Sequence, residues 1–261
     1  MTKTIFITGA GTGLGKGTAL GLAKEGHHVI ASVENHPQVT SLRQEAKEAG
    51  VKMEVFKMDI TNPEDQIRME RYDFDIFVAN AAINEGGPLG EVPMSAFREI
   101  FEVNVFSTLE TARIAAAKFV EKQEGKIVFM SSMAGVMASG YKGLYAASKH
   151  ALEAIAKSLS EEMKEFNVKV ATINPGPFDT GFNDRAAEEK WEWFDKEVHY
   201  TSPEKMQEND KGLDSQFPAE DMIAEMVRII PKDSHKFRTA YPQKTADSMR
   251  QEEQENWEKE M

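Results

Sequence analysis

Along the first two-thirds of the chain, short runs of β-branched and aromatic residues alternate with longer segments whose apolar residues recur every three or four positions. This alternation is typical of βαβ units, in which helices join parallel strands. It predicts strands at residues 4–7, 29–33, 53–56, 75–78, 126–129 and 168–173. Several of these runs are almost entirely apolar, as expected for strands that are covered on both faces.

The clearest helical patterns cover residues 94–124, 144–166 and 218–230, while residues 63–72 leave room for only a short helix. In residues 144–166, alanine, isoleucine and leucine fall three and four positions apart and mark one buried face. There is no internal repeat, low-complexity linker or break in composition that would indicate a domain boundary. The pattern therefore predicts an α/β fold, a doubly wound parallel sheet of the Rossmann type, as a single domain over residues 1–261.

Composition narrows the classes of function. The 261 residues suffice for a full hydrophobic core, and a net charge of −12 disfavours nucleic acid and membrane surfaces as partners. The absence of cysteine excludes disulfides, thiolate metal sites and a cysteine nucleophile, and the six scattered histidines predict no metal site. Without an apolar run of membrane-spanning length or a signal-peptide pattern, we expect a cytoplasmic protein.

The negative charge is unevenly distributed. Residues 184–211 hold nine acidic and five basic side chains, and residues 247–261 hold six acidic and two basic ones. The alternation of strands and helices loosens after Thr180, so we interpret residues 181–217 as a lid over the substrate, hinged at Gly181. Residues 247–261 form an acidic C-terminal segment. Both stretches could also be solvated helix faces.

A glycine-rich turn directly follows the first predicted strand. Gly9, Gly13 and Gly15 have the spacing G-x-x-x-G-x-G, with Thr12 and Leu14 in the same turn, and a helical pattern follows. Glycines allow a tight turn and a close backbone approach, and free N–H groups at a helix start face a pyrophosphate. A turn of this kind can serve a βα connection alone, but its position after the first strand favours a bound dinucleotide.

Glu34 lies at the end of the second predicted strand, nineteen residues after Gly15. A carboxylate there can accept hydrogen bonds from the ribose hydroxyls and repel a 2′-phosphate, so NAD is favoured over NADP. Lys16 could partly offset this preference, so NADP is not excluded. A loop glutamate without a ligand is the alternative interpretation.

A possible reacting group is formed by Ser132, Tyr145 and Lys149. Tyr145 and Lys149 are four residues apart in a predicted helix and therefore lie on one face of it. A tyrosine with a pKa near 10 is a poor base at neutral pH, and an adjacent ammonium stabilises its phenolate. Taken alone, this spacing is equally typical of a lysine stem lying over an aromatic ring.

Together, these motifs resemble those of the single-domain short-chain dehydrogenases/reductases. The resemblance covers roughly residues 3–181 and includes further pieces in the expected order: Asp59-Ile60, Asn80-Ala81-Ala82, Asn104, Asn174-Pro175-Gly176 and Thr180. The sequence departs from the family pattern at Ala82, where glycine is usual, and at Val33, where many NAD-dependent members carry aspartate. The family's serine-to-tyrosine spacing selects Ser132 rather than Ser131.

The resemblance implies an NAD(P)-dependent oxidoreductase that interconverts an alcohol and a ketone or aldehyde. Tyr145 would be the general acid/base, Lys149 would lower its pKa and hold the nicotinamide ribose, and Ser132 would donate a hydrogen bond to the carbonyl. Asn104 would anchor a water that relays protons toward Lys149. The implied cofactor contacts are Gly9, Thr12, Gly13, Leu14, Gly15, Glu34, Asp59 (adenine), Ile60, Asn80 (the ribose side), Tyr145, Lys149, Pro175, Gly176 and Thr180.

Related proteins usually form homodimers or homotetramers through the two long helices, here residues 94–124 and 144–166. The substrate is expected to be a small-molecule alcohol or carbonyl compound. Candidate pocket residues are Trp191, Trp193, Phe194 and Tyr200 in the predicted lid, and, more weakly, Asn84, Met133, Tyr141 and Phe178 beside the motifs. The aromatic lid residues could instead simply pack the insert onto the domain.

Two other functions remain alternatives. One is a cofactor-binding regulator without turnover, which would not need all four of Asn104, Ser132, Tyr145 and Lys149. The other is a lyase on the same fold that resembles the halohydrin dehalogenases. That resemblance would require an arginine in place of Lys149 and an interrupted glycine turn, and the sequence has neither.

Overall fold

A parallel sheet of seven strands forms the centre of the protein. The computed structural model describes residues 1–208, 210, 213 and 215–259. The strands lie in the order β3-β2-β1-β4-β5-β6-β9, and every neighbouring pair is parallel. They are β1 (Thr4–Ile7), β2 (His28–Val33), β3 (Glu54–Lys57), β4 (Ile76–Ala79), β5 (Gly125–Met130), β6 (Val168–Pro175) and β9 (Arg238–Tyr241). The predicted doubly wound fold is confirmed.

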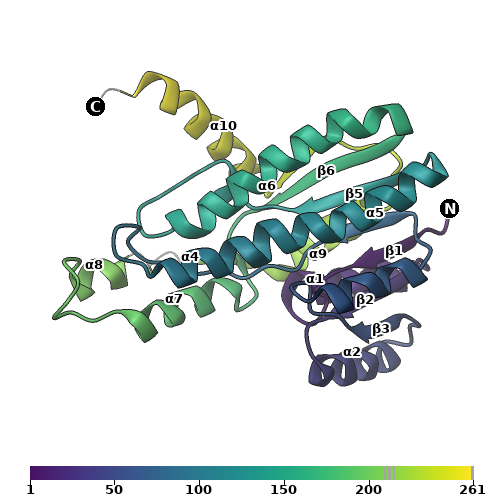
Figure 1. Cartoon of the computed structure of the whole chain (residues 1–261), viewed down its shortest axis with the longest axis horizontal. Coiled ribbons are helices and arrows are strands. Elements are labelled where there is room, and N and C mark those ends of the chain that lie inside the picture. Colours follow the sequence, from purple (N-terminus) through teal and green to yellow (C-terminus); the bar gives the residue numbers. More distant parts are fainter. Residues whose placement is uncertain (209, 211–212, 214, 260–261) are drawn as a thin grey trace.

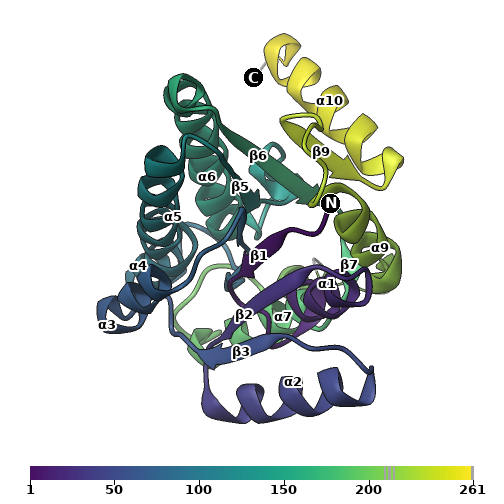
Figure 2. The ribbon, with the colours of Figure 1, turned by 90° about the vertical axis from the view of Figure 1, so that its right-hand side faces the viewer.

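Helices cover both faces of this sheet (Figures 1 and 2). One face carries α4 (Met94–Phe101), α5 (Thr108–Lys122) and α6 (Gly143–Glu162), and the other carries α1 (Gly13–Lys24), α2 (His36–Glu48) and α9 (Ala219–Ile229). Short helices α3 (Pro63–Gln66) and η1 (Ile67–Arg71) form the third crossover, which is as short as predicted. Beyond the edge strand β9 the chain ends in α10 (Gln243–Glu258), which extends away from the sheet (Figure 1).

Two hydrophobic clusters, one on each face, hold the layers together. The first joins β1, β2 and β4 to α1, α2 and α9, with Leu22, Leu42 and Met226 fully buried. The second joins the opposite side of the strands to α5 and α6 through aromatic residues, including Phe77 and Phe119. Because both faces are covered, all four residues of β4 are buried, which explains the uninterrupted apolar runs in the sequence.

The predicted helix over residues 94–124 is not one α-helix. Between α4 and α5 the chain makes a π-helical turn, η2 (Glu102–Ser107). The wider turn brings Asn104 to the interior, where it has no exposed surface. Turns of this kind are rare and occur mostly at functional sites. A hydrophobic pattern cannot reveal the turn, because it inserts one residue without changing which residues are apolar.

The sequence pattern also missed β9 and α10. The four residues of β9 are only half-buried, as expected at a sheet edge, so they lack a strand-like hydrophobic run. The predicted lid contains a two-stranded pair, β7 (Phe178–Asp179) with β8 (Phe217–Pro218), and the helices α7 (Phe182–Trp193) and α8 (Pro203–Glu208). Residues 209, 211, 212 and 214 of that segment, and residues 260 and 261 of the acidic C-terminal segment, lie outside the described residues.

The strand order reverses between β1 and β4, whose carboxyl ends leave a crevice between the two sets of crossovers. The motifs identified in the sequence follow these strand ends. α7 and α8 lie beyond the same ends, at the lower left of Figure 1. The fold therefore gathers residues from six separate loops at one edge of the sheet.

Candidate active site

The glycine turn after β1 has the conformation and the crowding that require glycine. Gly9 and Gly13 have φ angles of +64° and +52°, a region that side chains other than glycine rarely adopt. A methyl group on Gly15 would lie 2.4 Å from the amide nitrogen of Asn80 and 2.5 Å from the carbonyl oxygen of Gly9. Thr12 is the N-cap of α1, and Leu14 packs against the first hydrophobic cluster. The first turn of α1 thus presents free N–H groups to the crevice.

Asn80 fixes this turn from the end of β4. Its side-chain nitrogen donates to the carbonyl oxygens of Thr8 at 2.9 Å and Gly9 at 3.0 Å. The hydroxyl of Thr8 in turn accepts from the backbone N–H groups of Asn80 and Ala81. The predicted role of Asn80 beside the cofactor ribose is untested by these contacts. Its hydrogen bonds show that it holds the shape of the glycine turn.

The carboxyl end of β2 carries an acidic residue without an adjacent free cation. Glu34 is exposed, and its backbone N–H donates to the side chain of Gln38 at 3.0 Å. Gln38 lies against the glycine turn, because a methyl group on Gly11 would be 2.5 Å from its Oε1. The Lys16 ammonium lies 3.1 Å from the carboxylate of Glu45, so this cation is already partly neutralised.

The end of β3 contributes Asp59 and Ile60. The Asp59 carboxylate accepts from the backbone N–H of Thr61 at 2.9 Å and from its hydroxyl at 2.7 Å, which fixes its direction at the strand end. Ile60 is 6% exposed and belongs to the second hydrophobic cluster. Its side chain is therefore a core contact, and only its backbone is available to a ligand.

Ser132, Tyr145 and Lys149 meet beside the ends of β5 and α6. The hydroxyls of Ser132 and Tyr145 form a hydrogen bond that favours the phenolate and thus lowers the tyrosine pKa, while burial raises this pKa above its usual value. The Lys149 ammonium lies 5.5 Å from the centre of the Tyr145 ring and donates to the carbonyl oxygen of Met130 at 2.9 Å. Lys149 is only 2% exposed, and burial lowers its pKa to about 8.

Asn104 lies behind this group in the π turn. Its Oδ1 accepts from the N–H of Ile83, and its Nδ2 donates to the carbonyl of the same residue, both at 2.9 Å. The same Nδ2 is 3.1 Å from the hydroxyl of Ser148, which donates to the carbonyl oxygen of Tyr145. Asn104 thus joins the segment after β4 to the helix that carries Tyr145 and Lys149.

The segment after β6 closes the other end of the crevice. The N–H of Gly176 donates to the carbonyl of Tyr241 at 2.9 Å, which ties buried Pro175-Gly176 to β9. A methyl group on Gly13 would lie 3.5 Å from Cβ of Thr180, so this threonine faces the glycine turn. The predicted nicotinamide segment and the predicted pyrophosphate turn therefore lie next to each other.

The α7 helix extends across the segment that follows β4. Phe182 makes an edge-on ring contact with Tyr145 at 5.9 Å, and Trp193 belongs to the small hydrophobic cluster that includes Tyr145. The indole N–H of Trp193 donates to Glu85 at 2.9 Å. Burial raises the pKa of this carboxyl group, the Trp193 hydrogen bond opposes that shift, and nearby glutamates strengthen it.

The candidate pocket residues divide into several groups. Phe178 is wrong as a pocket residue: it is 3% exposed and stacks on Tyr241 within the first hydrophobic cluster, because β7 passes under α9. Tyr200 is 81% exposed, with its backbone N–H bound to the Glu91 carboxylate. The rings of Trp191 and Phe194 contact each other within the lid. Asn84, Met133 and Tyr141 are half-buried beside the motifs.

Sequence reasoning missed a buried polar network next to the catalytic group. It consists of Glu153 on α6, Asn174 at the end of β6 and Arg238 on β9. Only the position of Glu153, one helical turn after Lys149, gave a signal in the sequence. Gln38 was also missed, although it is the fourth residue after Glu34 and follows the N-cap of α2.

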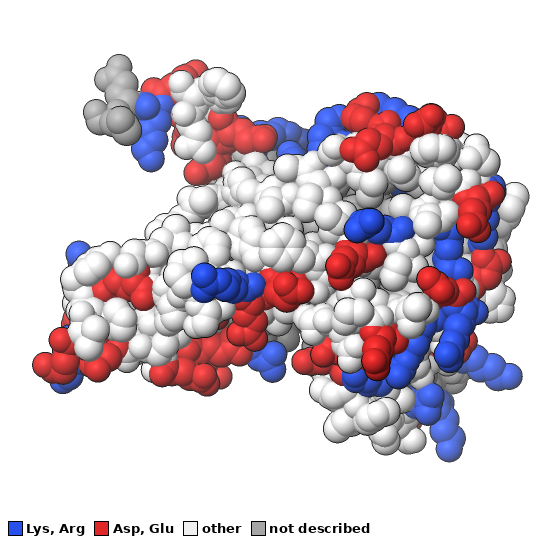
Figure 3. All heavy atoms as spheres, viewed as in Figure 1, with Lys and Arg blue, Asp and Glu red and all other residues white. Residues whose placement is uncertain are grey.

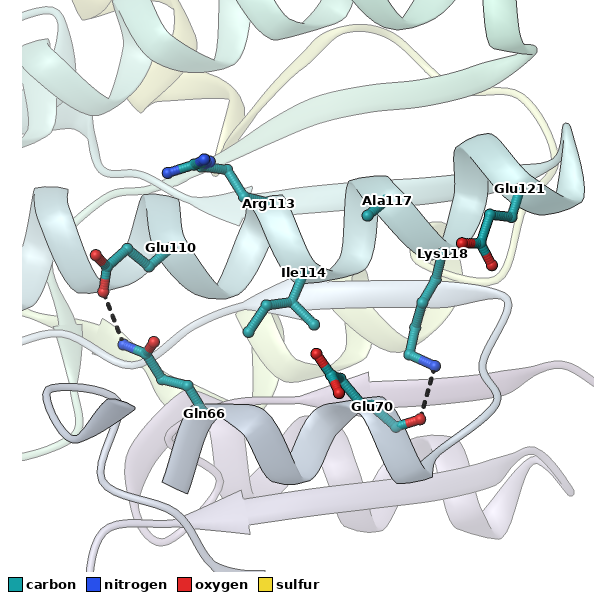
Figure 4. A pocket seen from close by; sticks show the side chains of 8 residues that line it. All are labelled: Gln66, Glu70, Glu110, Arg113, Ile114, Ala117, Lys118 and Glu121. Atoms are coloured by element: carbon teal, nitrogen blue, oxygen red, sulfur yellow. Dashed lines mark hydrogen bonds between the residues drawn. The ribbon is translucent and has the colours of Figure 1, made fainter. Parts of the chain in front are cut away.

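Other surfaces do not supply this chemistry. Acidic side chains gather over α7 and α8 and again over α10 (Figure 3). A groove on the outer side of α5 lies away from the motifs and is lined by Gln66, Glu70, Glu110, Arg113, Ile114, Ala117, Lys118 and Glu121 (Figure 4). Within the described residues, no group of three or more His, Asp or Glu side chains could hold a metal ion, and no helix is long and apolar enough to cross a bilayer.

Comparison with known proteins assigns the family. The model of the short chain dehydrogenase family matches residues 3–191. The chain belongs to this family. A diacetyl reductase [(S)-acetoin forming] from Staphylococcus epidermidis is 31% identical over 196 residues, which are 72% of this chain and 76% of the relative. An uncharacterized oxidoreductase from Myxococcus xanthus is 34% identical over 180 residues, 67% of this chain and 71% of the relative.

Solved structures show the same fold. A short-chain dehydrogenase from Streptomyces avermitilis superposes with a TM-score of 0.82 at 22% identity, covering 99% of this chain and 94% of that one. An NAD⁺-bound xylitol dehydrogenase gives 0.76 at 22% identity, covering 92% and 97%. A dehydrogenase from Sphingobium yanoikuyae in complex with NADPH gives 0.74 at 20% identity, covering 99% and 96%. As a short-chain dehydrogenase, the chain is an oxidoreductase acting on CH–OH groups with a nicotinamide cofactor.

Proposed function

We propose that this short-chain dehydrogenase interconverts a small secondary alcohol and its ketone with NAD, and that Tyr145 is the general acid/base. The observation that carries the proposal is the joint placement of Ser132, Tyr145 and Lys149. A hydroxyl donor, a phenol and an ammonium converge there at the end of the crevice that begins at the glycine turn. This set can bind a carbonyl oxygen and deliver a proton to it.

In the direction of reduction, Ser132 and Tyr145 hydrogen-bond the carbonyl oxygen of the substrate. The bound nicotinamide supplies the hydride to the carbonyl carbon. As negative charge develops on the oxygen, Tyr145 transfers its phenolic proton there, which leaves an alcohol and a phenolate. The positive charge of Lys149 stabilises that phenolate, and oxidation follows the same steps in reverse.

The charge distribution around Lys149 is suited to this role. Burial raises the pKa of Tyr145, so the isolated phenol holds its proton strongly. Neutralising the phenolate therefore requires a nearby cation, and Lys149 is within reach of the ring. Asn104 supports this arrangement through Ser148 and the backbone of Tyr145. We assign to Asn104 the anchoring of a proton-relaying water near Lys149.

The preference for NAD rests on the adenosine end of the crevice. Glu34 provides a carboxylate at the position expected for the ribose hydroxyls, and this charge would repel a 2′-phosphate. Two nearby cations are engaged elsewhere: Lys16 pairs with Glu45, and Arg43 donates to the carbonyl of Val55 at 2.7 Å. The family's solved structures include both NAD- and NADP-type complexes, so the preference must come from this chain's own residues.

We assign the lid role to residues 181–217, with Phe182 and Trp193 as apolar walls beside Tyr145. The hinge is Gly181, whose φ of +74° precedes α7 and whose Cβ position is open. Apolar walls favour an uncharged substrate, and the Staphylococcus relative is named for diacetyl reduction. Diacetyl and acetoin are therefore the first substrates to test.

We further propose a homo-oligomer that packs through α4, η2 and α5. Met94 and Phe106 are 57% and 54% exposed on this face, and Phe106 lies beside the stacked rings of Phe97 and Phe101. Large apolar side chains that remain exposed together mark an interaction surface.

The test combines a substrate panel with two matched variants. The protein is assayed with diacetyl, acetoin and other small ketones and alcohols, with NADH and NADPH in parallel. Tyr145→Phe should lower kcat by about a hundredfold or more while leaving NADH binding intact. Tyr72→Phe, which removes a remote half-buried hydroxyl, should retain full turnover. Turnover by Tyr145→Phe at the wild-type rate would overturn the assigned role, and NADH binding without turnover on any substrate would favour the regulator.

A further inference from the structure

A buried carboxylate lies directly behind the proposed catalytic group. Glu153 is 6% exposed and sits on α6 one turn after Lys149. One of its oxygens accepts from the side-chain nitrogen of Asn174 at 2.6 Å. The other accepts from Nη2 and Nε of Arg238 at 2.9 and 3.2 Å. A carboxylate is costly to bury unless such donors are held in place, so this network has a defined geometry.

The network reaches the main chain at Ser132. The side-chain nitrogen of Asn174 that binds Glu153 also donates to the carbonyl oxygen of Ser132 at 2.9 Å. Its Oδ1 accepts from the hydroxyl of Thr172 at 3.0 Å, so the amide of Asn174 has a single orientation. Glu153 therefore fixes Asn174, and Asn174 fixes the backbone of the residue that faces the phenol of Tyr145.

The network also acts on Lys149 through its charge. Burial lowers the pKa of Lys149 to about 8, and the negative charge of Glu153 opposes this shift. On α6 the groups that face the ammonium are Tyr145 and Glu153. On the far side of Glu153, β9 contributes Arg238, and α10 contributes Glu253, 3.8 Å from that guanidinium.

We propose that Glu153 is a positioning residue of this active site: held by Arg238, it keeps Lys149 charged and keeps the Ser132 backbone in place through Asn174. The proposal rests on the proposed function only for its effect on turnover. Its effect on Lys149 is a property of the protein alone and can be measured without substrate or cofactor.

The direct test is the titration of Lys149 by NMR in protein carrying isotope-labelled lysine. The signal is assigned from its loss in Lys149→Met. In Glu153→Gln the midpoint should fall by about one pH unit, because one negative charge has been removed one helical turn away. Glu161→Gln is the matched control: the same substitution, two turns further along α6, at an exposed glutamate paired with Lys157 and Lys164. It should leave the midpoint unchanged.

A second variant tests the sign of the effect. Arg238→Gln removes the cation on the other side of Glu153 but keeps an amide donor, and Asn174 still binds the carboxylate, so Glu153 stays ionised. The Lys149 midpoint should then rise. A residue with a merely structural role would not move the midpoint in opposite directions in the two variants. Arg238 is 35% exposed at its side chain, so this variant is expected to fold even where Glu153→Gln does not.

The proposal is overturned if Glu153→Gln leaves the midpoint of Lys149 where it is in the wild type. It is equally overturned if Arg238→Gln leaves this midpoint unchanged or lowers it. Once an alcohol substrate is identified, Glu153→Gln should also move the acid limb of the kcat/KM profile for oxidation to higher pH. A shifted Lys149 titration in a protein without any turnover would instead refute the proposed function and leave the role of Glu153 intact.

Discussion

Replacing Gly15 by alanine tests the packing that shapes the predicted cofactor site. The added methyl group would lie 2.4 Å from Nδ2 of Asn80 and 2.5 Å from the carbonyl oxygen of Gly9. Neither distance is tolerable, and the Gly9 carbonyl belongs to the backbone and cannot rotate away. The Asn80 side chain must therefore move, and its hydrogen bonds to Thr8 and Gly9 are lost.

The competing contributions can be estimated. Two hydrogen bonds are worth about 1 kcal/mol each, and the forced displacement costs about 1–3 kcal/mol. Alanine gains about 1 kcal/mol over glycine within a helix, which offsets part of this loss. We therefore expect Gly15→Ala to lower the free energy of unfolding by about 2–3 kcal/mol, equivalent to about 5 °C in Tm.

The expected effect on cofactor binding is larger than this change in stability suggests. The displaced amide no longer holds the glycine turn, so its N–H groups lose their preorganised direction, and NADH should bind at least about tenfold more weakly. Binding is measured by calorimetry and stability by urea unfolding. Gly140→Ala is the control, since its methyl group would meet no atom within 4 Å. If Gly15→Ala binds NADH and unfolds as this control does, the argument from crowding is refuted.

Four further predictions follow from the same contacts. Glu34→Gln should narrow the preference for NADH over NADPH about tenfold, measured as the ratio of the two KM values, because the charge that repels a 2′-phosphate is gone. Trp193→Phe removes the donor to buried Glu85, so the carboxyl group becomes harder to ionise; KM for ketones should rise severalfold with NADH binding unchanged. Phe106→Glu should reduce the mass measured by light scattering from an oligomer to a monomer; an unchanged mass would place the interface elsewhere. Burial by itself raises the pKa of Asp65, but its bonds to Lys57, to the Asp59 N–H and to Arg68 lower it overall. The stability that Asp65 contributes is therefore present above pH 4 and lost as the pH falls below the usual carboxyl range, and urea unfolding of Asp65→Asn should lack this acid-dependent loss.

Much of the fold was accessible from the sequence because its signals are local. Strands covered on both faces must be continuously apolar, and helices must repeat their apolar residues every three or four positions. The glycine turn and the Tyr145–Lys149 pair are local as well, since a backbone conformation or a single helical turn defines each of them. For this reason, the strands of the sheet apart from its edge strand β9, and the order of the motifs along it, followed from the sequence.

What the sequence did not reveal depends on partners far apart in the chain. The π turn at Asn104 exists because its amide binds the backbone of Ile83, and Phe178 is buried because β7 passes beneath α9. Glu153 and Arg238 are 85 residues apart, and either alone reads as an ordinary charged residue. The sequence determined which elements form and which chemistry is present. Only the tertiary structure decided which side chains support that chemistry, because burial and hydrogen bonding depend on what packs against a residue and not on its neighbours in the chain.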